Sequence, residues 1–111
     1  MTETLTPTMT DLPTVIIETV AKYCYVEMTD LKAPNKGKRE VCDCRHICVS
    51  LLKKYTDMTY DSIGSNFANR DHSTVIHSLR VSDGLLESDK VFRAKYELCD
   101  EQIKKYISYE S

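Results

Sequence analysis

A run of polar side chains, Asn69-Arg70-Asp71-His72-Ser73-Thr74, is the part of this sequence with the most chemically active groups. It places a carboxylate, an imidazole and a hydroxyl at consecutive positions, and these are the groups of a hydrolytic triad. Because adjacent residues on a helix project about 100° apart, Asp71, His72 and Ser73 cannot serve together as orienting group, base and nucleophile. The sequence therefore predicts that these residues do not form an enzyme active site.

The same side chains suit recognition of nucleic acid. Arg70 is a candidate for a phosphate or base contact, or for an ion pair with a surface carboxylate. Asp71 can accept hydrogen bonds from cytosine amino groups in the major groove, or it can simply be the N-cap of a helix. His77 is either a backbone contact or an ordinary surface histidine. The candidate DNA-binding residues of this segment are Arg70, Asp71, His72, Ser73, Thr74 and His77.

Two helices joined by a turn are needed to position these residues. The segment from Thr59 to Gly64 is typical of a short helix capped by Thr59, and a turn containing Gly64 follows it. Ile63 and Phe67, four residues apart, should fill the core. Apolar residues then recur at helical spacing, which predicts a second helix over 71–86 with its first turn exposed. These residues are Val75, Ile76, Leu79 and Leu86. The sequence thus predicts a helix-turn-helix at about 59–86.

The motif Ile63-Gly64, Phe67 and Arg70-Asp71-His72-Ser73-Thr74-Val75-Ile76-His77 resembles the signature of the C-terminal domain of the bacterial chromosomal replication initiator DnaA. The resemblance extends over roughly residues 14–88. It includes Val20-Ala21-Lys22-Tyr23, Asp30-Leu31, a basic loop and Arg45. It implies an all-α domain that binds double-stranded DNA at a DnaA box and acts in replication initiation or its regulation. In such a domain His72 would donate a hydrogen bond to a base.

Several positions depart from the family pattern. Asp43 and Cys44 stand where the family has a basic residue and proline, which removes positive charge near the DNA. Ala68-Asn69 replaces a pair of glycines; if one of these positions needs a positive φ, asparagine tolerates it better than alanine. Ser73 replaces a threonine and lacks the methyl group that would touch a thymine methyl. We therefore expect the preferred DNA sequence to differ somewhat from that of the family.

Positive charge is concentrated just before the helix-turn-helix. The whole chain has a net charge of -2, but residues 32–54 carry seven basic and two acidic side chains, a local charge of +5. Attraction to phosphates depends on charges within about 8 Å, the Debye length at physiological salt. The local excess is therefore compatible with DNA binding, although the acidic total predicts weaker nonspecific affinity than a strongly basic domain would have.

The loop Lys32–Glu40 contains Pro, Asn and Gly, which predict an irregular segment. A solvated charged turn and a DNA contact both explain its basic side chains. In the DnaA family this loop inserts an arginine into the minor groove, whereas the matching positions here are mostly the more strongly hydrated lysine. A helix over Val41–Tyr55 follows, with one apolar side. The candidate phosphate or minor-groove contacts in these two segments are Lys36, Lys38, Arg39, Arg45 and Lys53.

The cluster of Cys42, Cys44, His46 and Cys48 suggests a metal site. On a helix, however, the Cys42 and His46 pair points about 160–200° away from the Cys44 and Cys48 pair. Four ligands cannot then converge on one tetrahedral ion, so we expect small buried thiols and no metal or other cofactor. No Gly-Lys-Ser/Thr loop that would cradle a phosphate is present, which predicts no ATP binding by that route.

The size and composition of the chain fit one helical domain. Its 111 residues include only three glycines and three prolines. We expect a flexible arm over 1–10 and an all-α domain of about six helices over 11–111. No apolar run approaches the roughly 18–20 residues that span a membrane, and the start lacks the features of a secretory signal. These features and the odd count of five cysteines predict a cytoplasmic protein with reduced thiols.

A long C-terminal helix is predicted over Asp89–Tyr109. Its apolar stripe consists of Phe92, Tyr96, Cys99, Ile103 and Tyr106. This stripe either closes the core of the domain or forms a contact with a second copy or another protein. A rival function follows from the second possibility: the chain is a protein-interaction module on a helix-turn-helix scaffold that has lost DNA binding. The acidic balance and the departures at 43, 44, 68 and 73 favour that alternative.

Overall fold

The computed structural model describes residues 12–34 and 37–110, and its described residues contain six α-helices and no strand. The helices are α1 (Leu12–Cys24), α2 (Met28–Leu31), α3 (Arg39–Tyr55), α4 (Tyr60–Ser65), α5 (His72–Ser88) and α6 (Lys90–Glu110). The predicted all-α class is confirmed. The predicted arm over 1–10 and the candidate Lys36 lie outside the described residues. The predicted loop ends two residues earlier than expected, at Lys38, because Arg39 and Glu40 already belong to α3.

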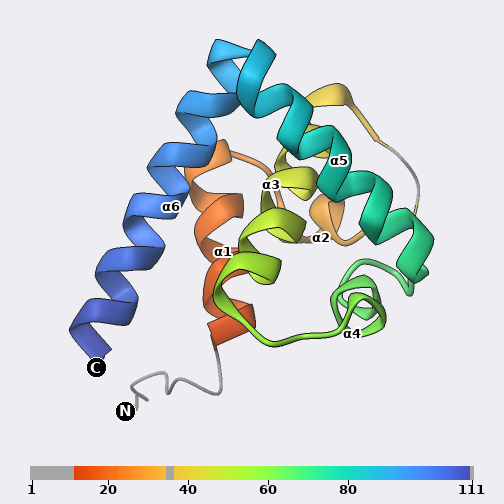
Figure 1. The fold of residues 1–111 in the computed structure, drawn as a ribbon, viewed down its shortest axis with the longest axis horizontal. Helices are drawn as coiled ribbons and strands as arrows, with labels where there is room; N and C mark the ends of the chain where they lie inside the picture. The colour runs from red at the N-terminus through yellow and green to blue at the C-terminus, as the bar shows by residue number, and fades with distance from the viewer. Residues whose placement is uncertain (1–11, 35–36, 111) are drawn as a thin grey trace.

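The core lies between α1, α3, α5 and α6. Figure 1 shows α1 near the centre of the fold, with α6 running along one side of it and α3 on the other. Ile16 and Val20 are buried on one side of α1, and Ile17 and Ala21 are buried next to them. The buried face of α1 is therefore wider than one helical stripe, because two neighbouring helices cover it.

The apolar stripe of α6 packs into the domain's own core. Phe92, Cys99 and Ile103 are at most 2% exposed, and Tyr96 and Tyr106 are partly buried against the same cluster. The stripe predicted as a possible dimer or partner contact is therefore already covered by the same chain. A contact with a second molecule through this helix would have to use other side chains.

The cysteines of the described residues are free thiols, and most of them are core residues. Cys44 and Cys48 are fully buried, as predicted, and Cys24 and Cys99 are buried with them. No group of three or more potential ligands among the described residues is placed to hold a metal ion. Within the same residues, no helix combines the length and the apolar character needed to cross a membrane.

The turn between α4 and α5 determines where α5 begins. A Cβ atom on Gly64 would lie 1.8 Å from the carbonyl oxygen of Arg70, so only glycine allows this close approach. The Gly64 oxygen accepts hydrogen bonds from the amides of Phe67 at 2.9 Å and Arg70 at 3.1 Å. Ala68 and Asn69 both adopt the left-handed conformation, with φ of 62° and 57°. The sequence left open whether one of these positions needs positive φ; both positions have it, and alanine is the more strained residue there.

The carboxylate of Asp100 holds α6 against the end of α3. It is buried and accepts hydrogen bonds from the Tyr55 hydroxyl at 2.5 Å and from Lys54 Nζ at 3.0 Å. Burial raises the pKa of Asp100, but the hydrogen bonds from Tyr55 and Lys54 outweigh this effect, and the net pKa is lowered. Burial and the hydrogen bond to Asp100 raise the pKa of Tyr55 to about 12.

Replacing Asp100 with asparagine should lower the free energy of unfolding by about 1–3 kcal/mol at pH 7, since charge-assisted hydrogen bonds are lost. The folded-state pKa of Asp100 lies below its unfolded value near 4, so its contribution is fully present above that pH and declines as the pH falls further. Urea denaturation at pH 7 and pH 3 should therefore show a smaller difference between wild type and variant at pH 3. The exposed neighbour Glu101, changed to glutamine, is the control. An equal difference at both pH values would contradict a role for the charge.

Replacing Ala68 with glycine should raise the free energy of unfolding by about 1 kcal/mol, because glycine adopts positive φ without the clash of a Cβ atom. Ala94, exposed on α6, is the matched control, and the same substitution there should lower stability by about 1 kcal/mol. Thermal or urea unfolding measures both. If the two substitutions destabilise alike, position 68 does not need a left-handed backbone in solution.

Candidate nucleic-acid interface

The first turn of α5 presents polar side chains to solvent. Asp71 is the N-cap, and its Oδ1 accepts hydrogen bonds from the Thr74 amide and the Thr74 hydroxyl, both at 2.9 Å. The hydrogen bonds from Thr74 lower the pKa of Asp71, so the carboxylate is charged at neutral pH. The N-cap explanation is therefore correct, and Oδ2 accepts no hydrogen bond from the described residues. Asp71, His72, Ser73 and Thr74 are all exposed, whereas Val75 on the inner face is 2% exposed.

His72 lies beside an acidic residue that the sequence pattern did not indicate. Its Nδ1 atom is 3.7 Å from Oδ1 of Asp61, which sits in the first turn of α4. Both side chains are largely exposed, so the pair contributes little to stability. Asp61 adds negative charge close to the candidate base contacts. Only the geometry of the turn brings the two residues together, and no spacing rule would have predicted it.

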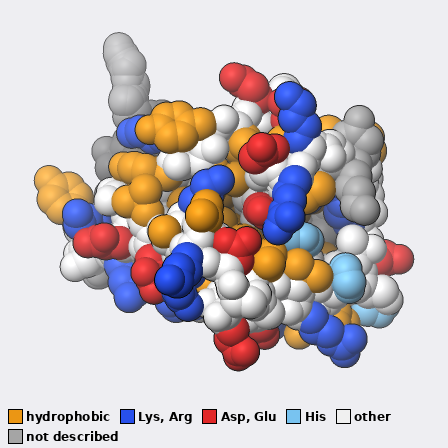
Figure 2. Space-filling view, turned by 90° about the horizontal axis from the view of Figure 1, so that it is seen from above, with side chains coloured by type: hydrophobic (Ala, Val, Ile, Leu, Met, Phe, Trp, Pro, Cys, Tyr) orange, Lys and Arg blue, Asp and Glu red, His pale blue; other side chains and the backbone are white. Residues whose placement is uncertain are grey.

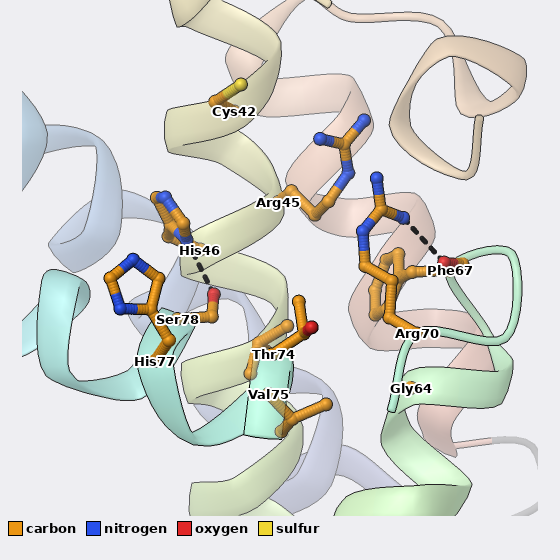
Figure 3. A pocket seen from close by; sticks show the side chains of 11 residues that line it. Cys42, Arg45, His46, Gly64, Phe67, Arg70, Thr74, Val75, His77 and Ser78 are labelled. Carbon is orange, nitrogen blue, oxygen red and sulfur yellow. Dashed lines mark hydrogen bonds between the residues drawn. The ribbon is translucent and has the colours of Figure 1, made fainter. Parts of the chain in front are cut away.

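A cavity of about 210 Å³ lies behind the exposed turn, between α3, the α4–α5 turn and the start of α5 (Figure 3). The lining residues include Arg45, His46, Arg70, Thr74, His77 and Ser78. The Nδ1 atom of His46 is 2.5 Å from the Ser78 hydroxyl. Burial, together with the charges of His77 and Arg45, lowers the pKa of His46 to about 4, so the imidazole is neutral at physiological pH. His77 is exposed at the edge of this cavity.

Arg70 is partly buried under the loop that precedes α3. Its Nη1 atom donates to the Phe67 carbonyl at 2.5 Å, and Nη2 donates to the carbonyls of Ala33 at 3.1 Å and Pro34 at 3.4 Å. The sequence predicted that Arg70 contacts DNA or pairs with a surface carboxylate, whereas these acceptors are backbone carbonyls of the same chain. Burial and the nearby charge of Arg45 lower the pKa of Arg70, although an arginine remains charged at any physiological pH.

Arg45 is not on the surface, contrary to the expectation that it faces the phosphates. It is 6% exposed, and its Nε and Nη2 atoms donate to the carbonyls of Leu31 at 2.8 Å and Asp30 at 3.0 Å. The prediction of its direction failed because the apolar pattern of α3 does not show that α2 covers this side of the helix. Figure 3 shows the side chains of Arg45 and Arg70 next to each other.

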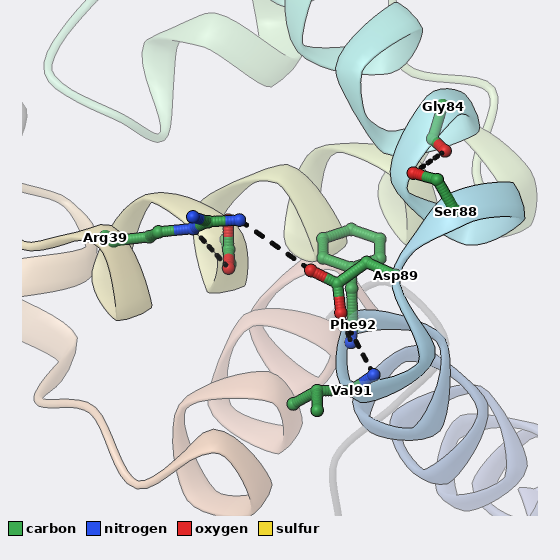
Figure 4. A network of polar contacts seen from close by, with 7 residues as sticks. Arg39, Gly84, Ser88, Asp89, Val91 and Phe92 are labelled. Carbon is green, nitrogen blue, oxygen red and sulfur yellow. Dashed lines mark hydrogen bonds and ion pairs between the residues drawn. The ribbon is translucent and has the colours of Figure 1, made fainter.

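The other basic candidates in the described part of the chain are exposed but are not all close to the start of α5. Lys53 places its ammonium group 4.8 Å from the centre of the Tyr60 ring, beside α4. Lys38 is exposed at the N-cap of α3. Arg39 is paired with Asp43 at 3.8 Å and with Asp89 at 3.7 Å (Figure 4). Since Asp89 follows the last residue of α5, Arg39 lies roughly one helix length, about 25 Å, from the exposed turn.

The face shown in Figure 2 has mixed charge. Histidine side chains gather on one side of it, and lysine and arginine side chains alternate with acidic ones. Because each acid reduces the local positive potential, such a surface attracts phosphates less strongly than a uniformly basic one.

Comparisons with known proteins agree with this geometry. The family model described as the bacterial DnaA protein helix-turn-helix matches residues 13–81. The chromosomal replication initiator protein DnaA of Bacteroides thetaiotaomicron is 36% identical over 90 residues, which are 81% of this chain and 19% of that protein. The protein of the same name from Neisseria meningitidis serogroup C is 36% identical over 83 residues, 75% of this chain and 16% of that protein. The one from Bacteroides fragilis is 34% identical over 90 residues.

The chain thus spans about a fifth of the length of the curated relatives it matches. The matched residues include α4, the tight turn at Gly64 and the first half of α5, which are the parts that form the exposed polar turn. The sequence resemblance and the observed helix-turn-helix lead to one conclusion: this chain belongs to the bacterial DnaA helix-turn-helix family.

Proposed function

We propose that this chain binds double-stranded DNA with sequence preference and inserts the start of α5 into the major groove. One observation supports this proposal above all: the polar side chains from Asp71 to Thr74 are exposed at the start of a helix whose opposite face is buried. Because its relatives are named chromosomal replication initiator proteins, we further propose a site similar to a DnaA box and a role in replication initiation or its regulation.

Each exposed residue has a proposed contact. The Oδ2 atom of Asp71 would accept from a cytosine amino group while Oδ1 continues to cap the helix. His72 and Ser73 would contact neighbouring base edges. Thr74 would bind a phosphate by exchanging its hydrogen bond to Asp71, and His77 would reach the backbone one turn further along α5. Lys36, Lys38 and Lys53 would bind phosphates, and Arg39 would do so further along the duplex.

A protein-interaction module is the second candidate function. The observation that favours it is the placement of Asp61 beside His72 and of Asp43 beside Arg39, since both acids oppose the charge that phosphates require. In that case the helix-turn-helix would be a scaffold whose DNA affinity has been lost. The two candidates differ in their dependence on salt.

Duplexes selected from a random pool should bind this chain with an affinity that falls steeply as salt increases. About four phosphate contacts would give a slope of roughly -4 for log affinity against log salt concentration. Fluorescence anisotropy at 50–200 mM salt measures the slope. Replacing Lys53 with alanine should make it shallower by about one contact, whereas the same change at Lys105, exposed on α6, should not alter it. An absence of selectable duplexes would support the interaction module.

Changing Asp71 to serine keeps a good N-cap but shortens the side chain and removes the carboxylate. The preference for the selected duplex over one with a replaced cytosine should fall roughly tenfold or more, while the melting temperature stays nearly the same. Changing His72 to alanine should reduce the preference at a different base pair. Glu87, exposed near the far end of α5, is changed to glutamine as the control. Equal weakening on both duplexes would show that Asp71 does not contact a base.

A further inference from the structure

We propose that Arg70 is a positioning residue that fastens Ala33 and Pro34, in the basic loop between α2 and α3, to the start of α5. The loop and the helix would then meet one duplex in a fixed register. This inference rests on the proposed DNA binding, because it assigns Arg70 a role in arranging the two DNA-contacting segments. It replaces the predicted direct contact of this arginine with DNA.

The hydrogen bonds of Arg70 join two distant parts of the chain. One guanidinium nitrogen donates to Ala33 and Pro34, which precede Arg70 by 37 and 36 residues, and the other donates to Phe67 within the turn. Arg70 immediately precedes Asp71, the N-cap of α5. The loop carbonyls are therefore attached through a single side chain to the residue where the exposed turn begins.

The backbone that carries Arg70 is itself held firmly. Its amide donates to the Gly64 oxygen at 3.1 Å, and its carbonyl lies too close to Gly64 for any side chain at that position. A long side chain anchored on such a backbone transmits the position of the turn to the loop. If the backbone of Arg70 were mobile, its hydrogen bonds would not fix the Ala33 and Pro34 carbonyls relative to α5.

Arg45 anchors the preceding residues in the same way. It donates from α3 to the carbonyls of Asp30 and Leu31, so two guanidinium groups bind four carbonyls between residues 30 and 34. Both arginines carry the same charge and lie near each other, and burial together with the Arg45 charge lowers the pKa of Arg70. A planar guanidinium with five donors can bridge several carbonyls, whereas the single ammonium of lysine cannot match that geometry.

The consequence for DNA binding concerns the loop lysines. Lys32 and Lys38 are exposed in the described part of the loop. If Ala33 and Pro34 are already fixed relative to α5, binding to a duplex has less of the chain to order, and the phosphate contacts of these lysines cost less entropy. Loss of the Arg70 hydrogen bonds should therefore weaken DNA binding through the loop, without removing a phosphate contact of its own.

Changing Arg70 to lysine tests this role, because it preserves the charge but not the hydrogen-bonding fork. We expect DNA affinity to fall on the order of tenfold, and a further Lys38→Ala change to weaken binding much less than it does in the wild type. Arg93, which donates to the Leu86 carbonyl at the α5–α6 corner, is the matched control. Arg93→Lys should leave the effect of Lys38→Ala unchanged. The proposal would be overturned if Arg70→Lys retained its affinity and the effects of Arg70→Lys and Lys38→Ala were additive. That result would instead identify a direct phosphate contact of Arg70.

A measurement without DNA separates this proposal from the proposed function. Trypsin should cleave after Lys32 or Lys38 faster in Arg70→Lys than in the wild type or Arg93→Lys, while circular dichroism shows an intact helical fold. If the wild type binds no duplex, the proposed function fails but the cleavage rates still decide whether Arg70 holds the loop. If Arg70→Lys does not fold, Arg70→Gln is used, since a neutral amide retains two donors. Equal cleavage rates in folded variants would overturn the proposal.

Discussion

The close approach of Gly64 to the Arg70 carbonyl is the constraint on which the rest of the interface depends. A Cβ atom at position 64 would lie 1.8 Å from that oxygen, so the turn can close only around glycine. This turn also requires a left-handed backbone conformation at two residues, Ala68 and Asn69. Because the turn is tight, Arg70 and the N-cap Asp71 are held beside α4, and the exposed start of α5 has one position relative to the core.

The contacts of three arginines determine where positive charge lies on the molecule. Arg45 and Arg70 donate to backbone carbonyls, and Arg39 pairs with Asp89 at the opposite end of α5. Arg45 and Arg70 keep their positive charge in these hydrogen bonds, so they still contribute to the potential near the start of α5, and Asp61 weakens that potential. If the chain binds DNA, base contacts must supply a larger share of its affinity than they would in a strongly basic domain, because fewer phosphate contacts contribute.

Local features of the fold could be predicted from the sequence, but long-range contacts could not. Thr59 and Asp71 cap α4 and α5 as their residue types predict, because capping involves only neighbouring residues. The burial of Ile63 and Phe67 followed from helical spacing in the same way. The prediction that Arg45 faces the phosphates was wrong, because its direction depends on α2 covering one side of α3. The pairing of Arg39 with Asp89 depends on how α3 and α5 cross. Neither contact has a signal in residue spacing.

The capping role of Asp71 is compatible with the recognition role proposed for the same side chain. The cap uses Oδ1 for two hydrogen bonds from Thr74, and the one from the Thr74 amide would keep the carboxylate oriented after the hydroxyl turns to a phosphate. They also lower the pKa of Asp71, so the group is an acceptor at neutral pH before any partner arrives. An acceptor that is already charged and oriented loses little entropy when it meets a donor. If Asp71 contacts a base as proposed, capping therefore does not compete with that contact, because it uses Oδ1 and leaves Oδ2 oriented for the donor.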